Sequence, residues 1–225
     1  MILQSNPAFI NYPAKAAFGR TLPKNKIYEH SNANTRLKNL FVEQVDQIIW
    51  QYKLAPETVN LAARPNVPEI QIFTIQLKTP DLNQDVLRCI DGAVHFPIIF
   101  ELKFDDRIQV IASYKRPSES DASRWMLSDY FATVWLPSDI DRISMPLALD
   151  MSGLYEQILQ RLIPIPARQQ ENLTDLVARI EEIMAKQREI EKIRGKLAKE
   201  KQFNRKVEIN ANLRQLKTEL EYLSR

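Results

Sequence analysis

The sequence predicts an α+β fold, in which a small mixed β-sheet with flanking helices precedes a C-terminal helical hairpin or coiled coil. Three observations predict it: apolar residues at helical spacing early in the chain, short β-branched runs around one helical stretch in the middle, and heptad-like spacing at the end. The chain has 225 residues, enough for one domain and an appended element. We expect an N-terminal arm over residues 1–32, an α+β domain over 33–166 and a helical arm over 167–225.

The first part of the chain contains one long predicted helix. Several prolines and few periodic apolar positions in residues 1–32 are typical of an arm with turns and short helices. From Ala33 apolar residues recur at steps of three and four, so we expect an amphipathic helix to about Lys53, ended by Pro56.

The middle of the chain contains the predicted sheet. The run Glu69–Leu77 is rich in isoleucine and predicts a buried strand, whereas Gln84–Ala93 has the apolar spacing of a helix. His95–Phe104 and Arg107–Tyr114 are two apolar runs separated by an acidic dipeptide, which predicts a β-hairpin. The order strand, helix, strand, strand indicates an α/β unit with a mixed sheet.

The last part of the domain closes the sheet and adds a helix. Arg124–Trp135 carries aromatic and apolar residues and predicts one strand or a strand pair. Leu147–Leu162 has helical spacing, and Pro164 and Pro166 then end the domain.

Beyond Pro166, two apolar seams predict helices that pack along their length. The first seam runs through Leu173, Leu176, Ile180, Ile183, Gln187 and Ile190, and the second through Ile209, Leu213, Leu216, Leu220 and Leu223. The seams are out of phase, so the segment is either one long helix with a slip in register or an antiparallel hairpin that folds back near Gln202–Arg205. The charged residues between the seams favour the hairpin.

Composition excludes several function classes. Hydrophobic residues at 44% and charged residues at 26% match soluble globular proteins, and no apolar run is long enough for a membrane helix, so no membrane partner is expected. The single cysteine, Cys89, allows no internal disulfide, which favours a cytoplasmic location. Four isolated glycines permit no phosphate-binding loop, and two isolated histidines have no partners at ligand spacing. We therefore expect no cofactor and no metal site.

One constellation resembles an active site. Asp81, followed by Glu101 and Lys103 on a predicted strand, satisfies the PD…ExK pattern of restriction-type nucleases, in which two carboxylates hold Mg²⁺ and the lysine positions the attacking water. Asp81, however, precedes a helix instead of lying on an adjoining strand, and Asp91 at the end of that helix is only a rough substitute. We favour a structural role for Glu101 and Lys103 and keep a Mg²⁺-dependent nuclease as an alternative.

Positive charge is concentrated in the C-terminal arm. Residues 186–206 contain nine basic and three acidic side chains, a local net charge of +6. We favour a solvated helical face, with nucleic-acid phosphates or an acidic protein as sharper alternatives. The candidate nucleic-acid contacts are Lys196, Lys199, Lys201, Arg205 and Lys206 in the arm, together with Lys115 and Arg116 at the end of a predicted strand.

The chain resembles a known family in several blocks. These are Leu22–Asn25, Leu54–Leu61, Glu69–Phe73, Phe96–Glu101, Ala112–Arg116 and Lys201–Asn210. On these residues the chain is similar, nearly end to end, to the bacterial domain-of-unknown-function family forty-three ninety-one. Members of that family are often encoded beside helicase and DNA-methyltransferase genes in restriction-like phage-defence regions. The resemblance therefore implies an accessory role there and supplies no catalytic residues.

The block Lys201–Asn210 falls where the two seams lose phase, which is where a hairpin would turn. The candidate partner-docking residues at this turn are Gln202, Phe203, Asn204 and Arg205. Our leading hypothesis is a non-enzymatic adaptor that docks on a helicase or methyltransferase subunit, with a DNA-binding module as a further alternative. Pairing of the arm with a second copy of the chain is also compatible with the seams.

Overall fold

The sheet and the helical pair belong to separate parts of the chain. The computed structural model describes residues 8–31, 33–118 and 124–225. The chain divides into two compact units, Met1–Pro164 and Ile165–Arg225. The first unit is a mixed α+β fold and the second is a pair of helices, so the predicted fold class is confirmed.

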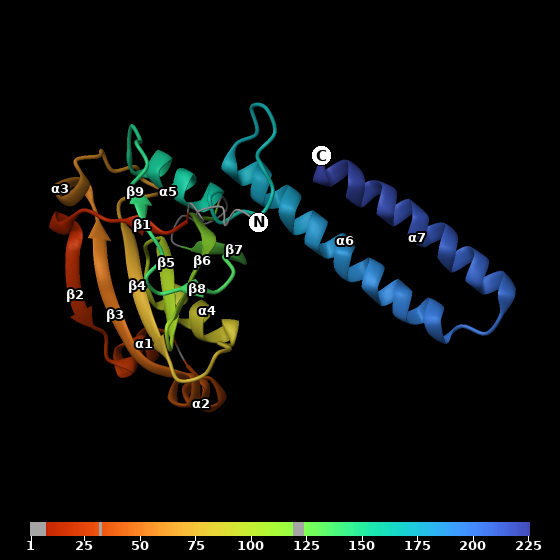
Figure 1. Ribbon diagram of the computed structural model, residues 1–225, viewed down its shortest axis with the longest axis horizontal. Coiled ribbons are helices and arrows are strands. Elements are labelled where there is room, and N and C mark those ends of the chain that lie inside the picture. The colour runs from red at the N-terminus through yellow and green to blue at the C-terminus, as the bar shows by residue number, and fades with distance from the viewer. Residues whose placement is uncertain (1–7, 32, 119–123) are drawn as a thin grey trace. The chain divides into compact units, whose positions relative to one another are not determined.

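A mixed sheet forms the centre of the first unit (Figure 1). Its strand order is β2-β3-β4-β5-β6-β7, and β8 pairs with β6 off this path. The strands are β2 (Ala17–Thr21), β3 (Val45–Leu54), β4 (Ile70–Leu77), β5 (Ile98–Phe104), β6 (Arg107–Pro117), β7 (Trp125–Ala132) and β8 (Leu136–Pro137). Neighbours are antiparallel except β4 and β5, which are parallel and connected by α4 (Gln84–Ala93). A parallel pair requires such a crossover, and this one makes the sheet mixed.

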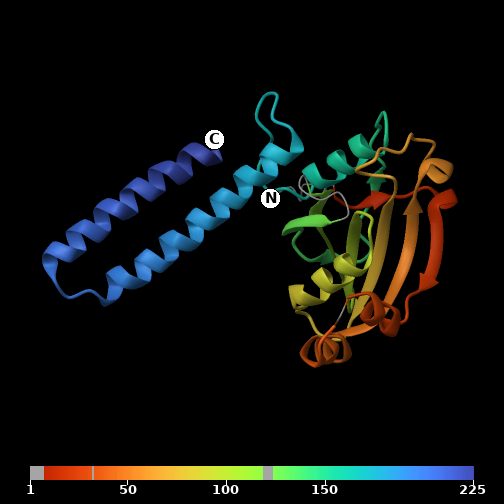
Figure 2. The same ribbon diagram turned by 180° about the vertical axis from the view of Figure 1, so that it is seen from behind.

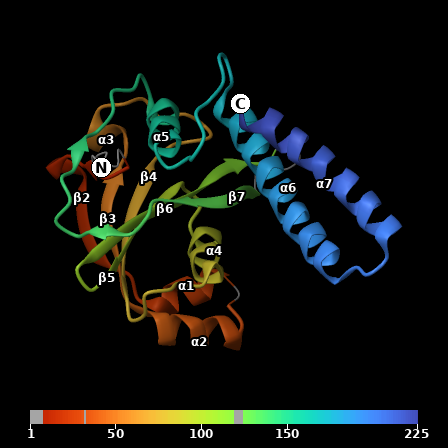
Figure 3. The same cartoon turned by 45° about the vertical axis from the view of Figure 1, so that its right-hand side comes forward.

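Helices α1 (Lys24–Ser31), α2 (Thr35–Gln44) and α4 pack against one face of the sheet (Figure 3). Their apolar side chains and those of the strands form one buried cluster, in which Phe41 and Ile90 from the helices pack with Phe100 from β5. This cluster is the hydrophobic core of the unit, and its burial is the main term that stabilises the unit.

The opposite face of the sheet carries one helix and a small two-stranded sheet. Helix α5 (Met151–Gln160) lies across β6 from α4 (Figure 3). Strand β1 (Ile10–Asn11) pairs in parallel with β9 (Ile143–Ser144) in a separate two-stranded sheet. Figure 2 shows the same ribbon from behind. A 3₁₀ turn, η1 (Ala14–Ala16), and the short helix α3 (Pro56–Val59) complete this unit.

Strand β6 contains a β-bulge whose backbone groups are satisfied by side chains. The register shifts between Ser113 and Lys115. The Lys115 N–H donates to the Tyr155 hydroxyl at 2.9 Å, and that hydroxyl donates to the Ser113 carbonyl at 2.9 Å. The Tyr114 N–H donates to the hydroxyl of Ser128 at 2.8 Å. Because buried backbone groups at a bulge need partners outside the ladder, Tyr155 attaches α5 to the sheet at this point.

The predicted helix from Ala33 to Lys53 is wrong in its second half. Helix α2 ends at Gln44, and the chain continues directly into the ten-residue strand β3. Strand β3 is hydrogen-bonded to β2 on one side and to β4 on the other, so pairing within the sheet overrides the helical spacing of its apolar residues. The predicted N-terminal arm also differs, because β2 and α1 belong to the sheet and its helical layer.

The second unit is an antiparallel helical hairpin of α6 (Leu173–Lys199) and α7 (Phe203–Ser224). Lys186 of α6 contacts Glu219 of α7 at 2.6 Å, and Ile190 packs with Leu213 in the seam. The hairpin alternative is therefore confirmed over the single long helix, although Gln187 is exposed and lies outside the seam. Among the residues described, no helix has the length and apolar character needed to cross a membrane.

We predict that Tyr155→Phe lowers the free energy of unfolding of the first unit by about 2 kcal/mol, because it leaves a buried N–H and a buried carbonyl at the bulge without partners. All three tryptophans lie in this unit, so urea denaturation followed by tryptophan fluorescence measures its unfolding alone. The control is Tyr28→Phe, which removes a hydroxyl of a half-buried tyrosine that has no hydrogen-bond partner within the described residues. Equal midpoints for the two variants would contradict the prediction.

Candidate functional site

The three residues of the PD…ExK pattern lie in different environments. Asp81 is exposed in the segment between β4 and α4, Lys103 is half-buried on β5, and Glu101 is 3% exposed two residues before Lys103. Both carboxylate oxygens of Glu101 accept from the guanidinium of Arg142, at 2.6 and 2.9 Å. The same guanidinium also donates to the carbonyl of Ile10 at 3.0 Å. Glu101 thus holds the segment of β1 and β9 against the sheet.

A buried tyrosine, Tyr12, interacts with the charges of this ion pair. Burial, together with the charge of Glu101, raises the pKa of Tyr12 far above its ordinary value, so its hydroxyl stays neutral. The Tyr12 ring lies 5.1 Å from the ring of Tyr52 on β3. The Glu101 carboxylate is therefore buried, with both of its oxygens bonded to the guanidinium of Arg142. Within the described residues no group of three or more His, Cys, Asp or Glu side chains is arranged to hold a metal ion.

The structure brings together Asp91 and Lys115, which the sequence placed in separate candidate sets. Lys115 is only 1% exposed, and its Nζ donates to the main-chain carbonyls of Asp91 and Val94 at 2.5 Å each. Its Nζ also lies 3.5 Å from Asp91 Oδ1, while the Tyr130 hydroxyl donates to Asp91 Oδ2 at 2.5 Å. Lys115 therefore caps the C-terminal end of α4 from β6 and is not available to a nucleic-acid phosphate.

Burial dominates the electrostatics of this cluster. It raises the pKa of Asp91 to about 6, against the opposing effects of Lys115 and of the Tyr130 hydrogen bond. It also lowers the pKa of Lys115, although the charge of Asp91 favours the ammonium form. A cavity of about 180 Å³ lies beside the cluster, with Trp125 in its wall. The neighbouring Arg116, the other candidate nucleic-acid contact on this strand, is half-buried.

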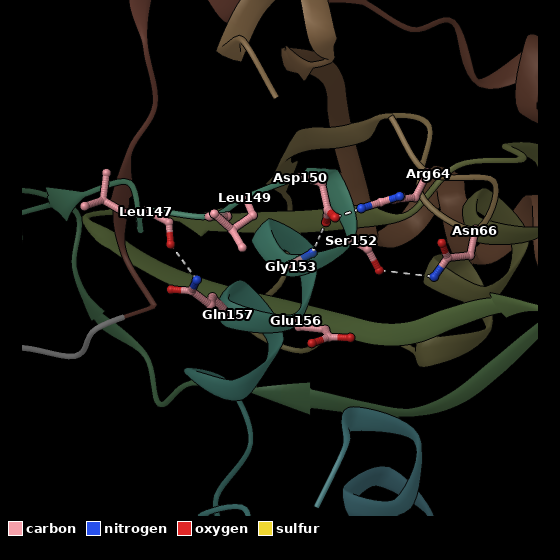
Figure 4. Close-up of a pocket in the computed structure, with 10 residues that line it drawn as sticks. Arg64, Asn66, Leu147, Leu149, Asp150, Ser152, Gly153, Glu156 and Gln157 are labelled. Atoms are coloured by element: carbon pink, nitrogen blue, oxygen red, sulfur yellow. Dashed lines mark hydrogen bonds and ion pairs between the residues drawn. The ribbon is translucent and has the colours of Figure 1, made fainter. Parts of the chain in front are cut away.

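A larger pocket lies at the N-terminal end of α5 (Figure 4). It has a volume of about 620 Å³, and its polar wall includes the ion pair between Arg64 and Asp150 at 2.7 Å. Leu147 and Leu149 at its edge are 94% and 97% exposed. The predicted helix Leu147–Leu162 is wrong at its start, since α5 begins only after Asp150, whose side chain accepts from the N–H of Gly153. Because the helix was predicted to start at Leu147, the exposed leucines that precede α5 were missed.

The tip of the hairpin exposes the predicted partner-docking residues. Phe203, the first residue of α7, is 78% exposed, and Val207 one turn later is 53% exposed. The carboxylate of Glu200 accepts from the N–H groups of Gln202 and Lys201, at 2.8 and 2.7 Å. These bonds lower the pKa of Glu200, and they fix the turn from which Phe203 extends. The other docking candidates, Gln202, Asn204 and Arg205, are exposed as well.

Charge is distributed unevenly along the hairpin. Toward its open end, Arg179 pairs with Glu171 at 2.7 Å and Lys186 pairs with Glu219. Toward the tip, several lysines form no ion pair with any described residue. They are Lys192, Lys196, Lys199 and Lys201. Three of these four are candidates from the sequence, and Lys192 was missed because it lies further from the turn.

The comparisons with known proteins give one match. A family model described as a domain of unknown function (DUF4391) matches residues 10–220, which cover most of both units. No curated protein and no solved structure matches the chain.

We predict that Asp91→Asn changes how stability depends on pH. An unfolded aspartate titrates near pH 4, whereas Asp91 titrates at about 6 in the folded protein, so the folded state binds this proton more tightly. Its stabilising effect is complete below about pH 4 and is lost as the pH rises to about 6. Relative to Asp91→Asn, the native protein should therefore lose about 3 kcal/mol of unfolding free energy over this interval.

Urea denaturation at a series of pH values, followed by tryptophan fluorescence, measures this difference. The control Asp85→Asn removes an exposed carboxylate from the first turn of the same helix, so it separates the loss of one negative charge on α4 from the loss of the buried carboxyl group. Parallel curves for native protein and Asp91→Asn would show that the carboxyl group does not titrate in this interval.

Proposed function

Because the chain belongs to the family of domains of unknown function DUF4391, whose description assigns no activity, we propose a function from the geometry of its surface. The protein is a non-enzymatic accessory subunit that docks on a helicase or translocase through the tip of its helical hairpin. Its setting is a restriction-like or phage-defence system, as the family resemblance implies.

One observation carries this proposal: the hairpin holds an exposed apolar tip in a fixed conformation. Phe203 and Val207 are four residues apart on α7, so they lie on one face of the helix. Exposed apolar residues that share a face are typical of protein interaction sites, and aromatic residues are enriched among those that dominate binding energy. Glu200 fixes the turn, so Phe203 is held at the start of α7 before a partner arrives.

The arrangement of the nuclease candidates supports a non-enzymatic role. Glu101 would need a carboxylate oxygen free for a metal ion, but both of its oxygens are bonded to Arg142. Asp81 is exposed in the segment between β4 and α4, and Lys103 is half-buried on β5, the same strand as Glu101. Partner docking needs only side chains that are already exposed, such as Phe203 and Val207. The nuclease alternative would require the ion pair between Glu101 and Arg142 to break.

An affinity pull-down of the tagged protein from its native host tests the proposal. Nuclease treatment removes bridging nucleic acid, and mass spectrometry identifies the proteins that remain. We expect stoichiometric recovery of a helicase, translocase or methyltransferase subunit. Recovery of the tagged protein alone, or only of untagged copies of it, would contradict docking on such a subunit.

We predict that Phe203→Ala weakens recovery of the partner about 30-fold, the effect of losing an interface residue worth about 2 kcal/mol. The matched control is Tyr222→Ala, because Tyr222 is also an aromatic residue of α7 with 72% of its surface exposed, but it lies at the opposite end of the helix. Both variants should keep the helical content of the native protein by circular dichroism. Equal retention of the partner by both variants would move the docking site away from the tip.

A further inference from the structure

A groove between α6 and α7 lies in the half of the hairpin nearest the tip. Its volume is about 480 Å³. Three cations line it from α6, Arg188, Lys192 and Lys196, and the amide of Asn212 lines it from α7. Two isoleucines from the seam, Ile193 and Ile209, also line it. The groove is thus formed within one rigid unit, with a basic wall and apolar side chains of the packed interface beside it.

The basic wall has a regular geometry. Arg188, Lys192 and Lys196 follow one another at steps of four residues, so they form a row along one side of α6. A rise of about 1.5 Å per residue places successive members of the row about 6 Å apart along the helix axis. A linear ligand with evenly spaced negative charges can contact all three at once.

Two of the three charges in this row, those of Lys192 and Lys196, are not neutralised by any residue that the structure describes. Lys186, two residues before Arg188 on the same helix, is by contrast paired with Glu219. One carboxylate, Glu189, also lines the groove, so the lining carries three positive charges and one negative charge. Cations at steps of four residues repel one another, and a bound anion would remove that repulsion.

We propose that this groove binds the sugar-phosphate backbone of a nucleic acid. The three cations of α6 contact successive phosphates, and the partly exposed side chain of Ile209 contacts a sugar between them. A nucleic-acid strand presents one phosphate per nucleotide at regular spacing, which matches a row of cations at regular spacing. An acidic polypeptide presents carboxylates at irregular spacing, so it fits this row less well. The groove is a second binding site, distinct from the partner-docking tip around Phe203.

Binding of purified full-length protein to labelled oligonucleotides tests the proposal without any protein partner. The probes are a 20-nucleotide single-stranded DNA, the matching single-stranded RNA and the matching duplex DNA, measured by fluorescence anisotropy at several salt concentrations. We expect log K for at least one probe to fall linearly with log salt, with a slope of about 2 for a single strand and about 3 for a duplex if three phosphates are contacted. The tightest probe identifies the form of nucleic acid recognised.

The double variant Lys192→Gln/Lys196→Gln should weaken binding about tenfold or more and lower the salt slope by about 1 for each lysine removed. The control is Arg214→Gln/Lys217→Gln, which removes the same charge from exposed positions of α7 outside the groove and should keep affinity and slope. Circular dichroism verifies that both double variants remain helical. Equal loss of binding in the two would show that net charge alone attracts the nucleic acid, and the groove proposal would then fail.

Two further results would also overturn the proposal. One is absence of binding to all three probes at low salt. The other is that the protein binds polyglutamate but none of the oligonucleotides, and that the variant Lys192→Gln/Lys196→Gln loses the binding of polyglutamate. This result would assign the groove to an acidic protein. The Phe203→Ala variant should bind oligonucleotides as the native protein does, so failure of partner docking and failure of the groove remain distinguishable.

Discussion

The buried ammonium group of Lys115 is the constraint on which the arrangement of the first unit depends. A cation that is 1% exposed must use its three N–H donors inside the protein, and Lys115 directs them to the carbonyls of Asp91 and Val94 and toward the Asp91 carboxylate. The last carbonyls of a helix have no partners within it and carry partial negative charge, so a cation fits there. The end of α4 is therefore fixed to β6, and the bulge that places Lys115 is fixed in turn by Tyr155 from α5.

A buried ion pair fixes the segment that packs on the other face of the sheet. On β5, Phe100 and Leu102 point into the helical core, and Glu101 between them points away and binds Arg142. Replacing a buried ion pair by apolar residues is often neutral for stability, whereas removing one partner is costly, so such a pair specifies an arrangement more than it adds stability. One buried charged contact on each face thus sets where α4 and the β1–β9 segment lie on an otherwise apolar sheet.

Helices and strands could be predicted from the sequence where the spacing of nearby apolar and turn residues specifies them. Strand β4, helix α4 and the hairpin of β5 and β6 lie where the sequence predicted them, because apolar spacing and the acidic turn specify them without reference to distant residues. Strand β3 was mispredicted because Val45, Ile48 and Ile49 fit a helix as well as a strand, and only pairing with β2 and β4 decides between them. The burial of Lys115 could not be predicted either, since a Lys-Arg pair at a strand end is ordinarily exposed and its acceptors come from a helix more than twenty residues earlier.

The hairpin combines its two proposed contacts in the half nearest the tip. Near the tip the buried seam consists of Ile190, Ile193, Leu213 and Leu216, and the row of cations beside it is repulsive. Replacing Lys192 or Lys196 by a neutral helix former would stabilise such a hairpin, so stability alone does not account for the row. Residues that lower stability without structural need are typical of functional surfaces. A polyanion in the groove would neutralise the row of cations and so remove their repulsion on α6. Because α6 and α7 pack together through the seam, this would also stabilise α7, which carries the exposed tip. The two contacts would therefore reinforce each other.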